Sequence, residues 1–333
     1  MAVLGSDRAR EHLINVYHQD SFPGYLERLD SMRMAFDAFT AGDWNRNIYN
    51  GWLHVLKLNL EPVVRPHRRS LVAKFTQSPV YADKTLMTTC SSWTELRHDT
   101  ILYAKQSYTT VGTKRLPEEP PPDRAYVEPK PAVFRRLAGL AAELRRLAAA
   151  VEEADKKLDA LVATASKLAD IADSELKGQE MSRQDAEFCK HIHSKIASMT
   201  KFSVGFRKKY LAEPKPVPPQ TEPKLKPESD QLEEIWTYAE KLDLGCSEPE
   251  DMVLVADVHT HPTTGSVLEE AVGNPVRLYA VIPFYGKQYL AIGACYSYYE
   301  FTKPMSQRMT DEEWRALDPK PPMPVWTQSF ITR

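Results

Sequence analysis

Hydrophobic side chains in the first half of the chain recur every three to four residues, which is the period of a helix with one buried face. The pattern predicts helices that begin after Ser6 and at Pro23, a third from about Trp44 to Leu56, and a strongly helical stretch from about Ser78 to Tyr108. Short polar turns join these segments, as is typical of antiparallel helical hairpins.

A heptad-like seam follows, in which apolar residues alternate at steps of three and four from Leu137 to Leu168. Such a seam predicts one long helix of roughly nine turns in the core of a bundle, with pairing to a second chain as the alternative. The helical pattern continues from Asp185 to Met199.

The pattern changes after a proline-rich stretch from Pro214 to Pro227, which is expected to be an extended linker. Asp230–Leu242 is expected to form a helix, and Thr310 with Glu313 to form a capping box at the start of a short one. Apolar and β-branched runs between glycine-containing turns predict strands in four segments, namely Met252–Thr260, Ser266–Glu270, Val276–Pro283 and Tyr289–Tyr299.

These elements together predict an α+β fold, with a mainly α-helical body and a small antiparallel β-sheet near the C-terminus. The body is expected to be a bundle or a set of α/α-toroid-like hairpins. The predicted units are the helical body over residues 1–212, a proline-rich linker over 213–229, and a C-terminal α+β segment over 230–333 that packs on the body.

Composition and charge are those of an ordinary globular protein. Of 333 residues, 42% are hydrophobic and 26% are charged, and the net charge is -2. That balance offers no electrostatic reason to expect binding to nucleic acid or to an anionic membrane. No run of about 20 apolar residues predicts a transmembrane segment. The first residues lack the pattern of a signal peptide, so the chain as given is expected in the cytoplasm.

The sharpest chemical signal is the polar end of the first predicted strand. Strict alternation along a strand would place Asp257, His259 and His261 on one face, about 6–7 Å apart in succession. Imidazole and carboxylate groups are ligands for a divalent metal that activates water, which makes these three residues a candidate metal site. A further ligand would come from Glu269, Glu270 or His98. The alternative is a cluster that only makes hydrogen bonds at the strand end.

A second polar cluster lies on the helix around residue 98. Glu95, His98 and Asp99 are candidate catalytic residues, because an imidazole beside a carboxylate is suited to acid–base work near neutral pH. The alternative is a structural network in which Arg97 or Lys105 pairs with these carboxylates and ties helices together. Aromatic residues offer a third kind of site, a sugar-stacking cleft, although a core role is expected for most of them. They are Trp44, Tyr49, Trp52, Trp93, Tyr296, Tyr298 and Tyr299.

Several strings resemble signatures of a prokaryotic family known as domain of unknown function 3160. They are Ser92–Tyr108, Tyr126–Pro129, Val255–Thr260, Val267–Pro275, Tyr296–Phe301, Pro304–Ser306 and Thr310–Trp314. The resemblance implies no agreed activity. It also implies that family members are longer, that this chain corresponds to their C-terminal half, and that an N-terminal half with any export signal is missing. Family members often carry an acidic residue at the position of His261.

Two functions are therefore expected as alternatives. One is a metal- or acid–base-dependent hydrolase whose site lies between the helical body and the C-terminal sheet. The other is a noncatalytic cell-envelope protein that binds a small molecule or a glycan in an aromatic cleft. A third reading is a fragment that exposes an apolar surface where its missing half docks.

Overall fold

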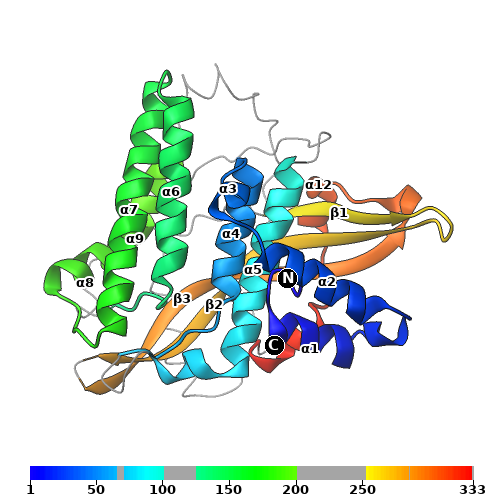
Figure 1. Cartoon of the computed structure of the whole chain (residues 1–333), viewed down its shortest axis with the longest axis horizontal. Coiled ribbons are helices and arrows are strands. Elements are labelled where there is room, and N and C mark those ends of the chain that lie inside the picture. Colours follow the sequence, from blue (N-terminus) through cyan, green and yellow to red (C-terminus); the bar gives the residue numbers. More distant parts are fainter. Residues whose placement is uncertain (66–70, 101–124, 201–252, 285, 332–333) are drawn as a thin grey trace.

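The computed structural model describes residues 1–65, 71–100, 125–200, 253–284 and 286–331 (Figure 1). The expected linker, the helix at 230–242 and the positions of Tyr103, Lys105 and Tyr108 lie outside these ranges. The helices are α1 (Asp7–Asn15), α2 (Tyr25–Asp37), α3 (Ala41–Trp44), α4 (Ile48–Leu60), α5 (Pro79–Thr100), α6 (Pro131–Ala148), α7 (Glu152–Leu176), α8 (Arg183–Lys190), α9 (Ile192–Thr200) and α12 (Asp311–Ala316). Short 3-10 turns are η1 (Gln19–Ser21), η2 (Lys74–Gln77), η4 (Met305–Gln307) and η5 (Val325–Ser329).

The predicted α+β class is confirmed, because the helices accompany a three-stranded antiparallel sheet in the order β1-β2-β3. Its strands are β1 (Leu254–His261), β2 (Ser266–Phe284) and β3 (Lys287–Pro304). β2 and β3 form one long ribbon, and β1 pairs only with residues 266–272 at the start of β2. The predicted starts of α1 and α12 are also confirmed. Ser6 caps α1 by accepting a hydrogen bond from the Ala9 amide, and Thr310 and Glu313 form the capping box of α12.

The expected turn at Gly273-Asn274 is wrong, because β2 runs through it as one strand with a shift of register between Gly273 and Val276. A β-bulge carries the same glycine and asparagine residues as a turn, so the sequence pattern did not separate the two. Glycine is required here, since a Cβ at position 273 would lie 2.8 Å from the Tyr299 ring and 2.9 Å from Ser297 Oγ.

The expected single helix along the heptad seam is also wrong. The seam is divided between α6 and α7, which pack side by side as a hairpin (Figure 1). Arg145 near the end of α6 forms ion pairs with Asp155 and Asp159 of α7, across the turn. Two helices that fold back on each other have the same apolar spacing as one long helix. The turn at residues 149–151 contains neither glycine nor proline, so the sequence does not indicate a break there.

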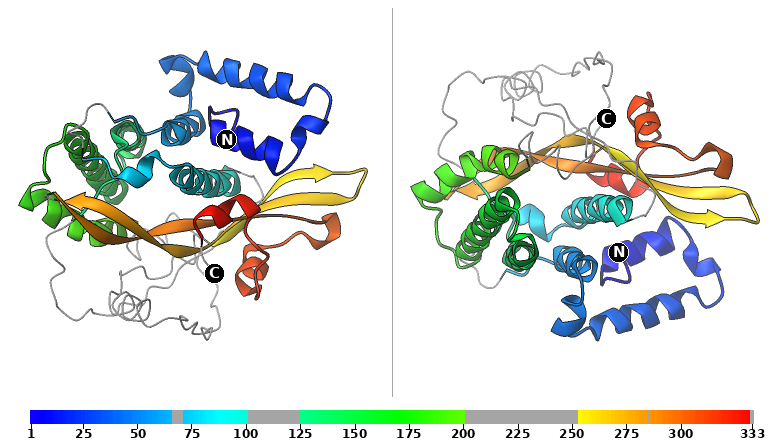
Figure 2. Two further views of the ribbon diagram at one scale, coloured as in Figure 1. Left: turned by 90° about the horizontal axis from the view of Figure 1, so that it is seen from below. Right: turned by 90° about the horizontal axis from the view of Figure 1, so that it is seen from above.

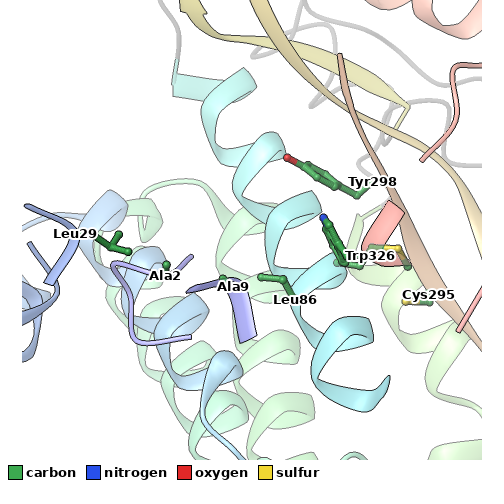
Figure 3. Packing of buried hydrophobic residues seen from close by; sticks show 8 residues of the cluster. Ala2, Ala9, Leu29, Leu86, Cys295, Tyr298 and Trp326 are labelled. Atoms are coloured by element: carbon green, nitrogen blue, oxygen red, sulfur yellow. The ribbon is translucent and has the colours of Figure 1, made fainter. Parts of the chain in front are cut away.

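α5 is the central helix of the fold. It packs against α1 and α4 on one side and against the sheet on the other, whereas α12 lies on the opposite face of the sheet (Figure 2). The core on the α5 side includes Leu86, Met87, Tyr298 and Trp326 (Figure 3). The core on the α12 side is built around the fully buried Trp314.

Both ends of the described chain are joined to α5 through the buried carboxylate of Asp83, which has no exposed surface. Arg8 donates to both of its oxygens, at 2.6 and 2.8 Å, and His12 Nε2 lies 2.6 Å from Oδ1. Ser329 Oγ donates to Oδ2 at 2.8 Å. The His12 ring also stacks on Trp326, 5.5 Å between centroids. Asp83 therefore ties α1 and η5 to the same helix.

The segment at residues 126–128 ties α5 to α7. Tyr126 accepts a hydrogen bond from the Ala73 amide, and Glu128 pairs with Lys84 and accepts a hydrogen bond from Tyr81 at 2.7 Å. The Val127 amide donates to Glu175 of α7 at 3.3 Å. This segment belongs to one of the strings shared with the family, and its contacts give that string a structural role.

Replacing Glu175 by glutamine is expected to stabilise the protein increasingly as pH rises. Glu175 is buried, its Oε2 has no hydrogen-bond partner among the described residues, and burial raises its pKa to about 8. The folded state then binds more protons than the unfolded one between the ordinary glutamate pKa and about 8, so wild-type stability falls as pH rises through that window. Glutamine does not ionise, so the variant lacks this loss of stability, which amounts to up to about 1.4 kcal/mol per pH unit.

Urea unfolding of both proteins at pH 5, 7 and 9 measures the effect. A difference between wild type and Glu175→Gln that stays constant across these pH values would show that Glu175 does not hold a proton in the fold.

No helix in the described ranges is both long and apolar enough to cross a membrane.

Candidate functional site

The free edge of β1 is closed by side chains from α5 and α12. The Val255 amide donates to Asp311 Oδ1 at 2.9 Å, the Asp257 carbonyl accepts from Arg97 at 3.2 Å, and the Val253 carbonyl accepts from Arg315 at 2.9 Å. These backbone groups face away from β2, and an open edge would leave them ready to pair with another strand. Their partners come from the family-like strings at residues 92–108 and 310–314 and from Arg315 just beyond.

His98 bridges α5 and α12 around this edge. Its Nε2 lies 2.9 Å from Asp311 Oδ2, and its Nδ1 lies 3.2 Å from Asp99 Oδ1. Hydrogen bonds to Asp311 and then to Asp99 raise the pKa of His98 to about 9. The ring is therefore an imidazolium at neutral pH, with both nitrogens donating, and it has no lone pair with which to act as a base.

Glu95 lies one turn before His98 and Asp99 on α5. Burial, with a further contribution from the charge of Asp99, raises the pKa of Glu95 to about 7. The three candidate catalytic residues are thus brought together, with Asp311 as a partner that sequence reasoning did not include. The Arg97 and His98 contacts tie α5 to β1 and α12, although Arg97 donates to a backbone carbonyl and not to the carboxylates that the structural alternative named.

Asp257 faces the α12 side of the sheet. It lies opposite Glu269 across the β1–β2 ladder, and Arg308 Nε lies 3.2 Å from its Oδ2. Glu269 is fully buried and accepts a hydrogen bond from the Met309 amide at 2.8 Å. Burial raises the pKa of Glu269, and the nearby Asp257 carboxyl adds to that rise. The two carboxyl groups form an acidic pair beside Arg308.

The two histidines at the end of β1 do not join Asp257. The register shifts between Asp257 and His259, so that Asp257 pairs with Glu269 whereas His259 pairs with Leu268. Neighbours on one strand point to opposite faces, which places Asp257 and His259 on opposite faces and makes the strict alternation expected from the sequence wrong here. Both histidines are exposed, their rings are 6.3 Å apart, and His261 Nδ1 accepts from the Thr264 amide. Within the described ranges, no group of three histidine, cysteine or acidic side chains is arranged to hold a metal.

A second carboxyl pair lies on the other face of the sheet, against α5. Glu270 and Glu300 are directly opposite each other on β2 and β3. Thr94 of α5 donates to Glu270 Oε2 at 3.1 Å, and Tyr298 donates to Glu300 Oε2 at 3.2 Å. The Tyr17 hydroxyl donates to Glu300 Oε1 and accepts from Trp326 Nε1 at 3.2 Å.

The two members of this pair differ in their surroundings. Burial raises the pKa of Glu270 to about 7, and the charge of Glu300 adds to the rise, whereas hydrogen bonds from Tyr298 and Thr94 oppose it. Burial, followed by the hydrogen bond to Glu300, raises the pKa of Tyr17. Glu270 is therefore half protonated near neutral pH and can donate a proton, while Tyr17 remains a neutral hydrogen-bond donor.

The sequence did not predict that Glu270 and Glu300 form a site together with Tyr17 and Tyr298. Glu270 was considered only as an additional metal ligand, Tyr298 only as part of an aromatic cleft, and Glu300 and Tyr17 not at all. A signal was present, since Glu270, Tyr298 and Glu300 all lie in strings shared with the family. Their convergence depends on the β2–β3 register, which the sequence pattern did not reveal.

Aromatic side chains are mostly engaged in packing. Trp44 is buried in a stack with Phe36, Phe39 and His54, and Tyr298 is buried beside Trp326. The other aromatic residues considered for a cleft are half-buried. Only Trp44 and Tyr298 of this set therefore have the core role that was expected for most of it.

Comparison with known proteins finds one family. A family model described as "Protein of unknown function (DUF3160)" matches residues 1–327. The match covers nearly the whole chain, which corrects the expectation that the resemblance is to the C-terminal half of the family. Neither the curated proteins nor the solved structures include a match to this chain.

Proposed function

Because the chain belongs to the DUF3160 family, whose description assigns no reaction, we propose from geometry alone that Glu270 and Glu300 form the acid–base pair of a hydrolase. The observation that carries the proposal is their position directly opposite each other between α5 and the sheet, with the pKa of Glu270 raised to about 7. A carboxyl group that holds a proton near neutral pH, opposite a second carboxyl group, is an arrangement suited to general acid–base catalysis.

The proposed reaction is hydrolysis with one proton donated and one accepted. Glu300, as the carboxylate, takes a proton from a water molecule while the water oxygen attacks the substrate and forms the new bond. Protonated Glu270 gives its proton to the leaving oxygen as the substrate bond breaks. Tyr17 and Tyr298 donate hydrogen bonds to Glu300 and hold its orientation. The water hydroxyl ends on one product and the Glu270 proton on the other, and a proton passes from Glu300 to Glu270 through solvent to restore the pair.

The outer side of the pair lies near the surface. The Tyr17 side chain is 37% exposed, and the hydrogen bond that it makes to Glu300 lies at the surface. Glu270 is on the inner side, under Thr94 of α5. Both carboxyl groups are half-buried, with Glu270 covered by α5 and Glu300 bonded to a tyrosine at the surface.

Acid–base chemistry at this pair is favoured over metal chemistry at the end of β1. The candidate ligands Asp257 and His259 lie on opposite faces of the sheet, so they do not converge on one ion. The metal site at Asp257, His259 and His261 stays a hypothesis, which metal analysis of the purified protein addresses. Among the residues that the structure describes, half-buried aromatic rings are the feature that favours the cell-envelope binding alternative.

The experiment that tests the proposal is a screen of the purified protein against chromogenic esters, phosphoesters and glycosides across pH. Activity on one of these classes is expected, and its rate should fall as pH rises through about 7, because Glu270 then loses the proton that it must donate. A hydrolytic rate that keeps rising well above pH 8 would contradict the role of Glu270 as the acid.

A further inference from the structure

The far half of the β2–β3 ribbon exposes an apolar face. Four directly opposed pairs lie on it, because opposed residues on antiparallel strands point to the same side. They are Arg277 with Ala294, Tyr279 with Ile292, Val281 with Leu290 and Pro283 with Gln288. Val281 is 52% exposed and Leu290 49%, although the opposite side of the same ribbon packs Val276 and Leu278 into the α5 core. A large exposed apolar surface of this kind marks an interaction site.

A small cavity extends this face toward η2. Its volume is about 200 Å³, and Val281 and Pro283 of the ribbon form one wall while Leu71 and Phe75 form the other. Arg65 and Lys74 line it as well, and Val64 next to Arg65 is 74% exposed. The apolar surface is thus bordered by positive charge.

The two chain segments that form this surface carry charge of one sign. Neither residues 62–82 nor residues 271–299 include an aspartate or a glutamate, whereas they contribute Arg65, Lys74, Arg277 and Lys287. The net charge of -2 over the whole chain conceals this local asymmetry. Segments that combine exposed apolar side chains, a tyrosine and cations are complementary to an anionic lipid bilayer.

We propose that the end of the β2–β3 ribbon, together with Val64, Arg65 and Lys74, is a peripheral docking surface for an anionic membrane. Val281 and Leu290 would enter the headgroup region, and the cations would contact lipid phosphates. A second copy of the chain fits less well, because it would bring these cations against the same cations. The surface lies at the opposite end of the ribbon from the β1–β2 turn (Figure 1).

Flotation with lipid vesicles tests the proposal. The full chain is expected to float with phosphatidylcholine vesicles that contain roughly one-third phosphatidylglycerol, to bind pure phosphatidylcholine at least about tenfold more weakly, and to be released by about 0.5 M salt. The double variants Val281→Asp/Leu290→Asp and Lys74→Glu/Lys287→Glu should each lower partitioning to anionic vesicles at least about tenfold.

Met34→Asp is the matched control, because Met34 is an equally apolar residue, 72% exposed, on the distant helix α2. Its partitioning should equal that of the wild type. The proposal is overturned if neither vesicle binds the protein, if neutral vesicles bind it equally, or if Met34→Asp loses as much as the ribbon variants. A concentration-dependent dimer that Val281→Asp/Leu290→Asp abolishes, without lipid binding, would assign the surface to a second copy instead. If Val281→Asp/Leu290→Asp does not fold, Lys74→Glu/Lys287→Glu tests the proposal by itself.

Discussion

Glutamine in place of Glu270 or Glu300 is expected to lower hydrolytic turnover by about a thousandfold each. A positioned general acid or base contributes roughly 10²–10⁴ in rate, and glutamine keeps the shape of the side chain while removing proton transfer. The double variant should be hardly slower than the worse single variant, because the two groups act in one step. Turnover of the best substrate from the screen, measured by initial rates at pH 6 and 7, gives the comparison.

Two controls make this result specific. Glu187→Gln on α8 changes an exposed carboxylate of the same kind and should leave turnover unchanged. Tyr298→Phe keeps both carboxyl groups but removes one hydrogen bond to Glu300, and we expect a loss of about tenfold. Wild-type turnover in both glutamine variants, with Glu187→Gln behaving identically, would remove Glu270 and Glu300 from the reaction.

Alanine at Asp83 is expected to cost about 3–5 kcal/mol of stability, the largest effect of any single substitution considered. Asp83 is buried and satisfies Arg8, His12 and Ser329 at once. Removing the central carboxylate leaves its partners short of hydrogen bonds in a region of low dielectric, which costs much more than the net worth of the pair. Urea unfolding at pH 7 measures the change in free energy.

Asp7→Ala supplies the comparison on the same helix. Asp7 is also ion-paired to an arginine, Arg33, but its side chain is 80% exposed, so solvent screens the interaction and a loss below about 1 kcal/mol is expected. Similar losses for Asp83→Ala and Asp7→Ala would mean that the buried network does not hold the termini to α5. Asp83→Asn, which keeps the hydrogen-bonding shape, should fall between the two.

Much of the fold could be predicted from local patterns, because these patterns have local causes. A hydroxyl or carboxylate before a helix satisfies orphan amides, which is why the caps at Ser6 and Thr310 were predictable. Apolar spacing likewise identified the helical segments and the antiparallel sheet. The spacing does not say whether a seam continues or folds back, so the α6–α7 turn was not predicted.

The candidate site was less predictable, because it depends on register. One extra residue in β1 after Asp257 reverses the face that His259 occupies, and the apolar pattern is the same with or without it. The Glu270–Glu300 pair needs residues 30 positions apart to come into register, which periodicity does not specify. The sequence indicates which polar residues are candidates for a site. The register of the strands determines which of these residues lie together.

The single helix α5 positions several separate parts of the molecule. Asp83 near its start holds the two ends of the described chain, and Thr94 contacts Glu270 of the carboxyl pair. Arg97 contacts the edge of β1 and His98 contacts Asp311 of α12. A displacement of the helix by one residue is a translation of about 1.5 Å, which would break all three sets of contacts together. A rigid helix, and not a loop, therefore fixes the positions of the residues at the site. Insertions in surface turns should be tolerated during the divergence of this family, whereas the length of α5 should hardly vary.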